Sequence, residues 1–115
     1  MASQPGLSDL RSAKLARRLP AGLSELAGPE HGTVSLPLHL AWSGLTTFDL
    51  DRPRLRMSYY RVVLAEGQRD DLVRYLNHDL LLGLWPTLRS LVSRDVREVW
   101  ESSFGELARS AHGAE

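Results

Sequence analysis

Apolar and polar positions alternate between residues 33 and 42, and this pattern predicts a strand. The apolar positions are Val34, Leu36, Leu38, Leu40 and Trp42. A period of two residues over this length is typical of a half-buried strand. Pro37 has no N–H to donate to a sheet ladder, so we expect an edge strand or a bent extended segment.

A second short β-like segment, from Thr46 to Leu50, follows the turn predicted at Ser43-Gly44. Together the two segments predict a small β-hairpin. A hairpin of this size needs a helix to pack against before it is stable.

The hydrophobic pattern then changes to a helical period. We expect a helix over residues 52–66, with Asp51 as its N-cap, Pro53 in its first turn and Gly67 as its stop. The predicted apolar face consists of Leu55, Tyr59, Tyr60, Val62, Val63 and Leu64. This helix is the predicted centre of the core.

Three more helical segments are expected. Residues 68–76 have two acidic residues, Asp70 and Asp71, in the first turn, where they are favourable at the positive end of a helix dipole. This helix is expected to break at residues 77–79. Residues 80–85 form an apolar segment that we expect to stop at Pro86. Ser93 is the predicted N-cap of a last helix, whose apolar face extends from Val96 to Leu107.

The predicted fold class is therefore mainly α with a small N-terminal β-hairpin (α+β), as a compact single helical domain. Proline and glycine residues divide residues 1–30 into short pieces, so we expect a flexible or partner-ordered N-terminal arm there. Residues 31–110 are the predicted globular domain, and residues 111–115 are a polar tail.

Composition narrows the possible functions. The 115 residues include no cysteine, which excludes disulfides, thiolate metal sites and a cysteine nucleophile. The 14 basic and 14 acidic side chains cancel, so the chain as a whole lacks the basic excess common in nucleic-acid-binding proteins. No long apolar run and no secretory signal is present, so we expect a cytoplasmic protein with no membrane contact.

Motifs that carry catalysis are missing from the sequence. The four histidines do not form a metal-binding spacing, and no nucleophile or phosphate-binding motif occurs. We therefore predict no catalytic residue, no metal and no cofactor. Asp70 and Asp71 are explained as residues of a helix start, and an enzyme that uses them would need a pocket with a second polar group.

Large aromatic and charged residues provide the candidate binding sites. We expect Trp85 and Trp100 in the core, and Trp42, beside the predicted turn, as a recognition anchor. The candidate partner-binding residues are Trp42, Arg52, Arg56, Asp70 and Asp71. The alternative is a DNA-binding regulator whose basic N-terminal arm contacts nucleic acid through Arg11, Lys14, Arg17 and Arg18.

Several short motifs between Leu38 and about Leu107 also form a recognisable pattern. They are Leu40-Ala41-Trp42-Ser43-Gly44, Phe48-Asp49-Leu50, Val63-Leu64-Ala65-Glu66-Gly67, Asp70-Asp71-Leu72-Val73-Arg74-Tyr75-Leu76, Leu84-Trp85-Pro86 and Val96-Arg97-Glu98-Val99-Trp100-Glu101. This pattern resembles a group of small proteins from high-GC bacteria, the antitoxin-like companions of abortive-infection-type nucleotidyltransferase toxins. The resemblance leaves out residues 1–30.

The resemblance implies a protein that binds and occludes a toxin encoded next door, and it implies no catalytic residue. We therefore hypothesise a non-enzymatic protein-binding module, an antitoxin or accessory partner. A DNA-binding transcriptional regulator is the alternative. The sequence predicts no particular oligomeric state.

Overall fold

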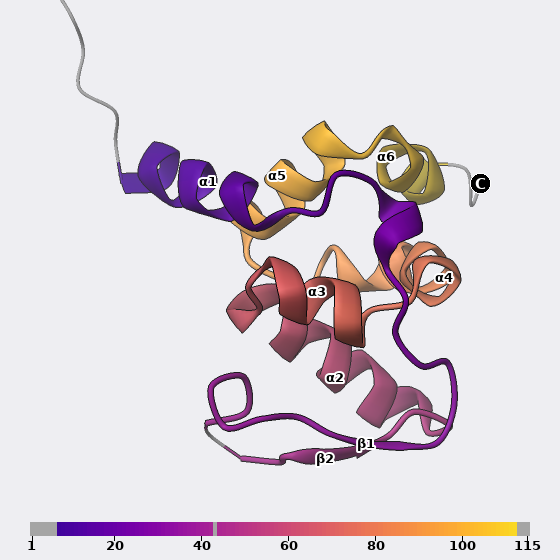
Figure 1. Cartoon of the computed structure of the whole chain (residues 1–115). Helices are drawn as coiled ribbons and strands as arrows, with labels where there is room; N and C mark the ends of the chain where they lie inside the picture. Colours follow the sequence, from indigo (N-terminus) through magenta and orange to yellow (C-terminus); the bar gives the residue numbers. More distant parts are fainter. Residues whose placement is uncertain (1–6, 43, 113–115) are drawn as a thin grey trace, which may run out of the picture.

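Helices make up most of the structure, and the hairpin lies between the first and second of them (Figure 1). The computed structural model describes residues 7–42 and 44–112. The elements are α1 (Leu7–Arg18), a short 3-10 helix η1 (Leu23–Glu25), β1 (Thr33–Ser35), β2 (Thr47–Asp49), α2 (Pro53–Glu66), α3 (Arg69–Tyr75), α4 (His78–Leu88), α5 (Arg94–Ser103) and α6 (Gly105–His112).

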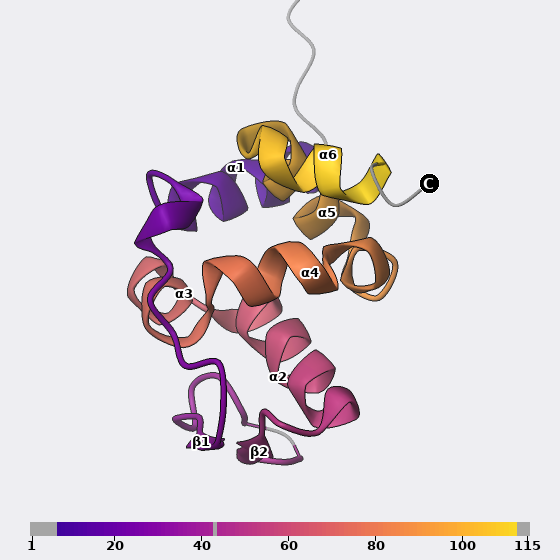
Figure 2. The same cartoon turned by 90° about the vertical axis from the view of Figure 1, so that its right-hand side faces the viewer.

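These elements form three levels, which Figures 1 and 2 show from two sides. Helices α1, α5 and α6 form one outer level, α2 to α4 the middle, and the hairpin the opposite outer level. Contacts of α1 with α5 lie within the first level, whereas contacts of α4 with α6 and of α2 with β2 join the levels. The expected mainly helical α+β class is confirmed, but the hairpin is not N-terminal, because α1 and η1 precede it.

The hairpin is shorter than predicted. Its antiparallel strands pair Val34 with Phe48 at their centre, and β1 ends at Ser35. The Pro37 carbonyl then accepts hydrogen bonds from the amides of Leu40 and Ala41, both at 3.0 Å, so the chain turns where a strand was expected.

The alternation from residue 36 onward has a different cause from a strand. Leu36 and Leu40, four residues apart, are buried, whereas Leu38 and Trp42 are exposed. A helical turn places residues four apart on the same side. The apolar positions therefore belong to a turn that buries two leucines and leaves two side chains in solvent.

Helix α2 is the centre of the core, as predicted. Its buried residues are Tyr59, Tyr60, Val63 and Leu64, while Leu55 and Val62 are half-buried. Its N-cap is Arg52, because the expected cap, Asp51, instead accepts a hydrogen bond from the Gly32 amide at 3.2 Å.

Gly67 ends α2 for a reason other than the expected one. Its φ is −74°, so the left-handed conformation common at helix ends is absent. A Cβ at this position would lie 2.5 Å from the Val63 carbonyl oxygen. Only glycine therefore lets the backbone of residue 67 lie this close to the last turn of α2.

The predicted stop at Pro86 is wrong, because α4 continues through Pro86 to Leu88. Proline has no N–H, so the Leu82 carbonyl loses its normal helical partner. The Ser110 hydroxyl of α6 donates to that carbonyl at 2.8 Å and replaces the missing partner.

The last predicted helix is in fact two helices. Ser93 caps α5 as expected, since its side chain accepts a hydrogen bond from the Val96 amide. The helix ends at Ser103 because Phe104 is extended, and α6 starts at Gly105. Phe104 and Leu107 are buried, so the break keeps both residues in the core.

Part of the expected N-terminal arm belongs to the core. Leu19, Leu23 and Leu26 are buried, and α1 packs against α5. The Arg69 guanidinium donates to the carbonyls of Leu19 at 3.0 Å and Arg17 at 2.9 Å, which ties the end of α1 to α3. The boundary expected at residue 30 therefore does not separate an arm from the domain.

The ends of the chain are described only in part. Residues 1–6 of the expected arm and residues 113–115 of the expected polar tail lie outside the described residues. Ala111 of that tail is in α6 and packs against the core.

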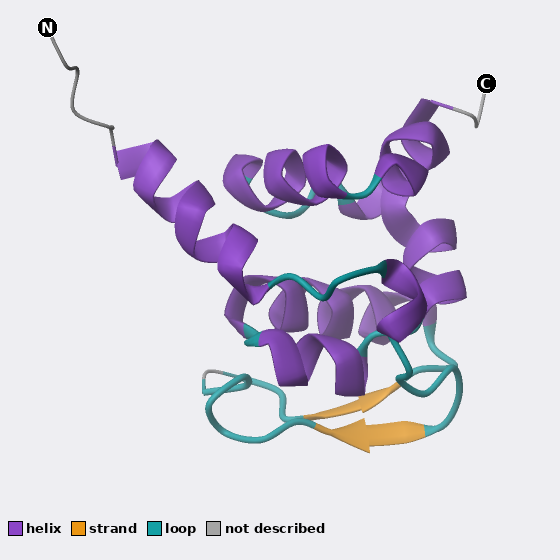
Figure 3. Cartoon of the chain, turned by 45° about the horizontal axis from the view of Figure 1, so that its top comes forward, coloured by secondary structure: helices purple, strands orange, loops and turns teal. Residues whose placement is uncertain are grey.

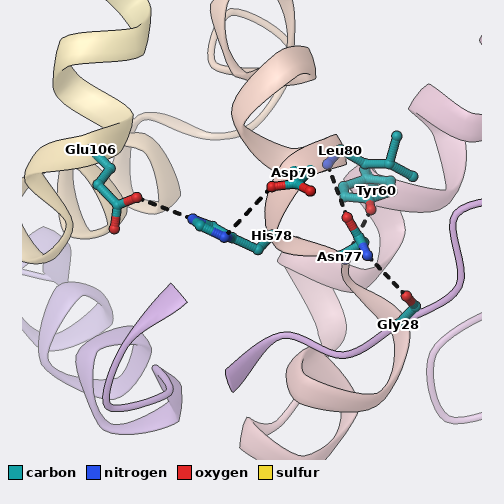
Figure 4. A network of polar contacts seen from close by, with 7 residues as sticks. All are labelled: Gly28, Tyr60, Asn77, His78, Asp79, Leu80 and Glu106. Carbon is teal, nitrogen blue, oxygen red and sulfur yellow. Dashed lines mark hydrogen bonds and ion pairs between the residues drawn. The ribbon is translucent and has the colours of Figure 1, made fainter. Parts of the chain in front are cut away.

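Asn77 joins the segment before the hairpin to the helices (Figure 4). Its side-chain oxygen accepts from the Leu80 amide and caps α4, its Nδ2 donates to the Gly28 carbonyl at 3.2 Å, and its backbone N–H donates to the Tyr60 hydroxyl at 3.0 Å. The predicted helix break is confirmed at Asn77, but it is shorter than expected, because His78 and Asp79 already belong to α4. Asn77 is also a junction between distant segments.

No helix in residues 7–42 and 44–112 combines the length and apolar character needed to cross a membrane.

Candidate protein-binding groove

A surface groove with a volume of about 430 Å³ lies between the loop that carries Trp42, helix α2 and the start of α5. We call it the Trp42 groove. It is lined by Leu40, Ala41, Trp42, Ser58, Arg61, Val62, Ala65, Glu66, Leu91, Val92, Ser93 and Val96. Most of these side chains are apolar or small.

Helix α2 contributes a narrow stripe to the groove. Ser58, Val62 and Ala65 follow the i, i+4, i+7 spacing that places residues on one helix face. At about 100° per residue, Arg61 and Glu66 lie at the two edges of this stripe. The groove therefore has an apolar centre with one basic and one acidic side chain beside it.

Trp42 forms one wall of the groove and is 70% exposed. Its neighbours Leu40 and Ala41 are buried, and their amides are bonded to Pro37, so the backbone before Trp42 is anchored. The structure thus agrees with the expected exposure of Trp42. Trp85 and Trp100 are buried, which confirms the prediction that they belong to the core.

Other exposed apolar side chains lie in the same two loops. The described residues include five large apolar side chains that are exposed, namely Leu10, Leu38, Trp42, Leu45 and Leu91. Leu38, Trp42 and Leu45 belong to the 36–46 loop, and Leu91 belongs to the segment between α4 and α5. Both segments contribute residues to the lining of the groove.

The other sequence-predicted partner residues do not line the groove. Arg52 is exposed at the opposite end of α2, 3.6 Å from the Asp49 carboxylate. Arg56 is half-buried, and its Nε is buried without a hydrogen-bond partner. The structure therefore does not bring these two arginines together with Trp42.

Asp71 has a structural role that connects it to the Trp42 loop. It forms a capping box with Gln68 at the start of α3, and its carboxylate lies 3.1 Å from His39 Nε2. Asp70 is exposed beside it. The sequence did not reveal the His39 contact, because His39 lies 32 residues earlier in a segment expected to be a strand.

The basic residues of the alternative site lie on a separate surface. Arg11, Lys14 and Arg17 line a second hollow of about 410 Å³ on α1, whereas Arg18 is half-buried. Arg11 lies 4.0 Å from Asp95 of α5. The first turns of α1 extend past the other helices in Figure 3.

The histidines whose side chains are described each lie beside a carboxylate. His78 Nε2 is 3.0 Å from Glu106, and its Nδ1 is 3.8 Å from Asp79 (Figure 4). His31 lies 3.0 Å from Asp51. The hydrogen bond from His31, together with the Gly32 amide, lowers the pKa of Asp51. In the described residues no group of three or more side chains is arranged to hold a metal ion.

Two buried tyrosines act as hydrogen-bonding groups within the core. Burial raises the pKa of Tyr60 to about 12 and also raises the pKa of Tyr59, so both hydroxyls are protonated at neutral pH. Tyr59 donates to the Tyr75 carbonyl at 2.7 Å. These hydroxyls hold α2 against the end of α3.

No family model, no curated protein and no solved structure matches this chain.

Proposed function

We propose that this chain is a non-enzymatic protein-binding module that uses the Trp42 groove to hold its partner. The observation that carries the proposal is the 70% exposure of Trp42 at the wall of an apolar groove. A large aromatic side chain held on an anchored backbone is a common hot spot of protein interfaces. Such residues lose little conformational entropy on binding, because they have only two rotatable side-chain bonds.

The surrounding surface supports the same function. Contiguous exposed apolar surface is uncommon on soluble proteins and often marks a binding site. The exposed side chains of Leu38, Leu45 and Leu91 belong to the loops beside the groove. A partner that covers the groove would remove Leu91, which lines it, from water together with Trp42, at about 25 cal/mol per Å² of apolar area.

The resemblance to antitoxin-like companion proteins suggests the partner. We propose a nucleotidyltransferase-type toxin encoded next to this chain, which the chain would occlude in the cytoplasm as an antitoxin or accessory protein. The motif Leu40-Ala41-Trp42-Ser43-Gly44 contributes both to the resemblance and to the wall of the groove.

Co-expression with the protein encoded next door tests the proposal. The wild-type chain should co-elute with that protein on size exclusion and relieve its toxicity, whereas Trp42→Ala should weaken both effects at least about tenfold. Leu10→Ala is the matched control, because Leu10 is an exposed leucine on α1 outside the groove. Equal loss with both variants, or no complex with the wild type, would contradict the proposal.

A second candidate function uses α1. Arg11, Lys14 and Arg17 line one hollow, which favours a DNA-binding regulator over scattered surface charge. Such binding should weaken steeply with salt, because it releases counterions from the phosphates. Lys14→Ala should reduce DNA binding and the salt slope together, while Trp42→Ala should leave both unchanged. Binding that is absent or independent of salt would remove this candidate.

A further inference from the structure

We propose that a second copy of this chain covers the Trp42 groove when no other partner is bound. In this two-fold dimer each copy inserts its Trp42 into the groove of the other. The inference concerns the same face as the proposed function and rests on it for the role of the dimer, which is to regulate access to the groove.

The shape of the surface around Trp42 favours a two-fold contact. The Trp42 side chain is exposed and lines the apolar groove, so a large apolar side chain and a hollow that could hold one lie together on one surface. A two-fold axis between two copies brings the same patch of both chains together, so residue i of one copy contacts residue j of the other and the reverse. A surface that carries both the Trp42 side chain and the groove is self-complementary under this symmetry, because the side chain of each copy can enter the groove of the other.

The charged residues at the edges of the groove favour the same contact. Arg61 and Glu66 both line it, and neither forms an ion pair within the described part of the chain. Arginines elsewhere do have carboxylate partners, for example Arg89 with Glu101 at 2.7 Å. A patch with one basic and one acidic side chain, neither of them in an ion pair, is electrostatically complementary to the same patch on a second copy, because Arg61 of one chain can face the partner's Glu66.

The whole-chain charge is also compatible with self-association. The 14 basic and 14 acidic residues give no net charge that would repel two copies. Burial of Trp42 and of the exposed Leu91, both of which line the groove, gives the contact its apolar contribution.

The dimer has a consequence for partner binding. Because Trp42 is buried in the dimer, a foreign partner has to compete with the second copy for the groove. The apparent affinity for that partner therefore falls as the concentration of this chain rises.

Sedimentation equilibrium of the full chain tests the dimer through charge reversal. The wild type should show a monomer–dimer equilibrium, and Trp42→Ala should weaken it at least about tenfold. Arg61→Glu and Glu66→Arg should each weaken it by a similar factor, because each leaves only like charges at the contact. An equimolar mixture of these two variants should dimerise again, since the groove of one is acidic and that of the other basic.

Arg54→Glu is the matched control, because Arg54 is exposed on the same helix but does not line the groove. It should leave the monomer–dimer equilibrium unchanged. Circular dichroism of each variant identifies any loss of folding, and the mixture of the two reversed variants provides a gain of association that misfolding would not give.

A wild type that stays monomeric at every concentration, or a mixture of Arg61→Glu and Glu66→Arg that fails to associate, would overturn the dimer. Neither result affects the proposed function, which is tested by the foreign partner and Trp42→Ala. If the dimer forms as described while the foreign protein binds without Trp42, the proposed function fails and the dimer stands.

Discussion

The Ser110 hydroxyl donates a hydrogen bond to the Leu82 carbonyl, which Pro86 leaves without its helical partner. This contact joins α6 to α4 across 28 residues of sequence. It explains how α4 continues through a proline that would normally end or kink a helix. A side chain of α6 therefore offsets the hydrogen bond that α4 loses at Pro86.

Ser110→Ala tests this relationship. The variant should lower the free energy of unfolding by about 1 kcal/mol, because it leaves the half-buried Leu82 carbonyl without a donor. In a Pro86→Ala background the cost should shrink, because the restored amide at position 86 can donate to the same carbonyl. Denaturant unfolding of the four chains in this double-mutant cycle measures the difference. An equal cost in both backgrounds would contradict the explanation.

Glu101 should contribute to stability in a pH-dependent way. Its carboxylate accepts hydrogen bonds from Trp85 Nε1 at 2.8 Å and from the Arg89 guanidinium at 2.7 Å. The hydrogen bond from Arg89, opposed by desolvation and helped by Trp85, lowers the pKa of Glu101 below its ordinary value of 4.5. This contribution is therefore present above that value and is lost as pH falls through the lower pKa of the folded state.

Glu101→Gln should cost about 1–2 kcal/mol of unfolding free energy at neutral pH, because Arg89 loses its charged partner beside the buried Trp85. Its stability should also fall less than that of the wild type on acidification. Glu98→Gln is the control, because the Glu98–Arg94 pair is exposed and should contribute less than about 0.5 kcal/mol. Similar losses from both substitutions, or an unchanged acid response in Glu101→Gln, would count against this role.

Gly28 should tolerate no side chain. A Cβ at this position would lie 2.4 Å from the Tyr75 carbonyl carbon, so the segment before the hairpin would have to move away from α3. Gly28→Ala should cost about 1–3 kcal/mol. Gly83→Ala should instead stabilise α4 by about 0.5–1 kcal/mol, since nothing lies within 4 Å of a Cβ there. Thermal unfolding that gives both variants the same sign of change would refute this difference.

Arg69 should hold α1 in place. Its guanidinium bonds to two carbonyls at the end of α1, and Arg69→Ala removes both hydrogen bonds. The amides of α1 should then exchange with solvent severalfold faster, equivalent to about 1 kcal/mol of local stability. Arg54→Ala, which removes an exposed arginine elsewhere, should leave this exchange unchanged. Unaltered exchange in Arg69→Ala would mean that α1 is held by its contact with α5 alone.

Local sequence signals predicted the features that depend on neighbouring residues. Ser93 has a short side chain that can accept a hydrogen bond from a nearby amide, and it caps α5 as predicted. The burial of Trp100 followed from its place on the apolar face of the last predicted helix, and the burial of Trp85 from the apolar character of residues 80–85. These features need no information from distant parts of the chain.

Features that depend on distant residues were not predictable in this way. At Pro86, the free Leu82 carbonyl of α4 is satisfied by Ser110, 28 residues later in the sequence. The end of α1 is bonded to Arg69, which lies 50 residues beyond Leu19. For the candidate site, the sequence identified Trp42 but not Arg61 or Glu66. Their unpaired state beside the groove depends on how α2 packs against the two loops.

Hydrogen exchange of the monomeric chain, diluted until the proposed dimer has dissociated, and of its complex with the protein encoded next door tests the use of the Trp42 groove. We expect slower exchange on binding in residues 40–42, 58–66 and 91–96, the three segments that contribute the lining of the Trp42 groove. We expect no change in the exchange of α1 between Leu10 and Arg17. Protection confined to α1, with unchanged exchange around the groove, would contradict the use of the groove.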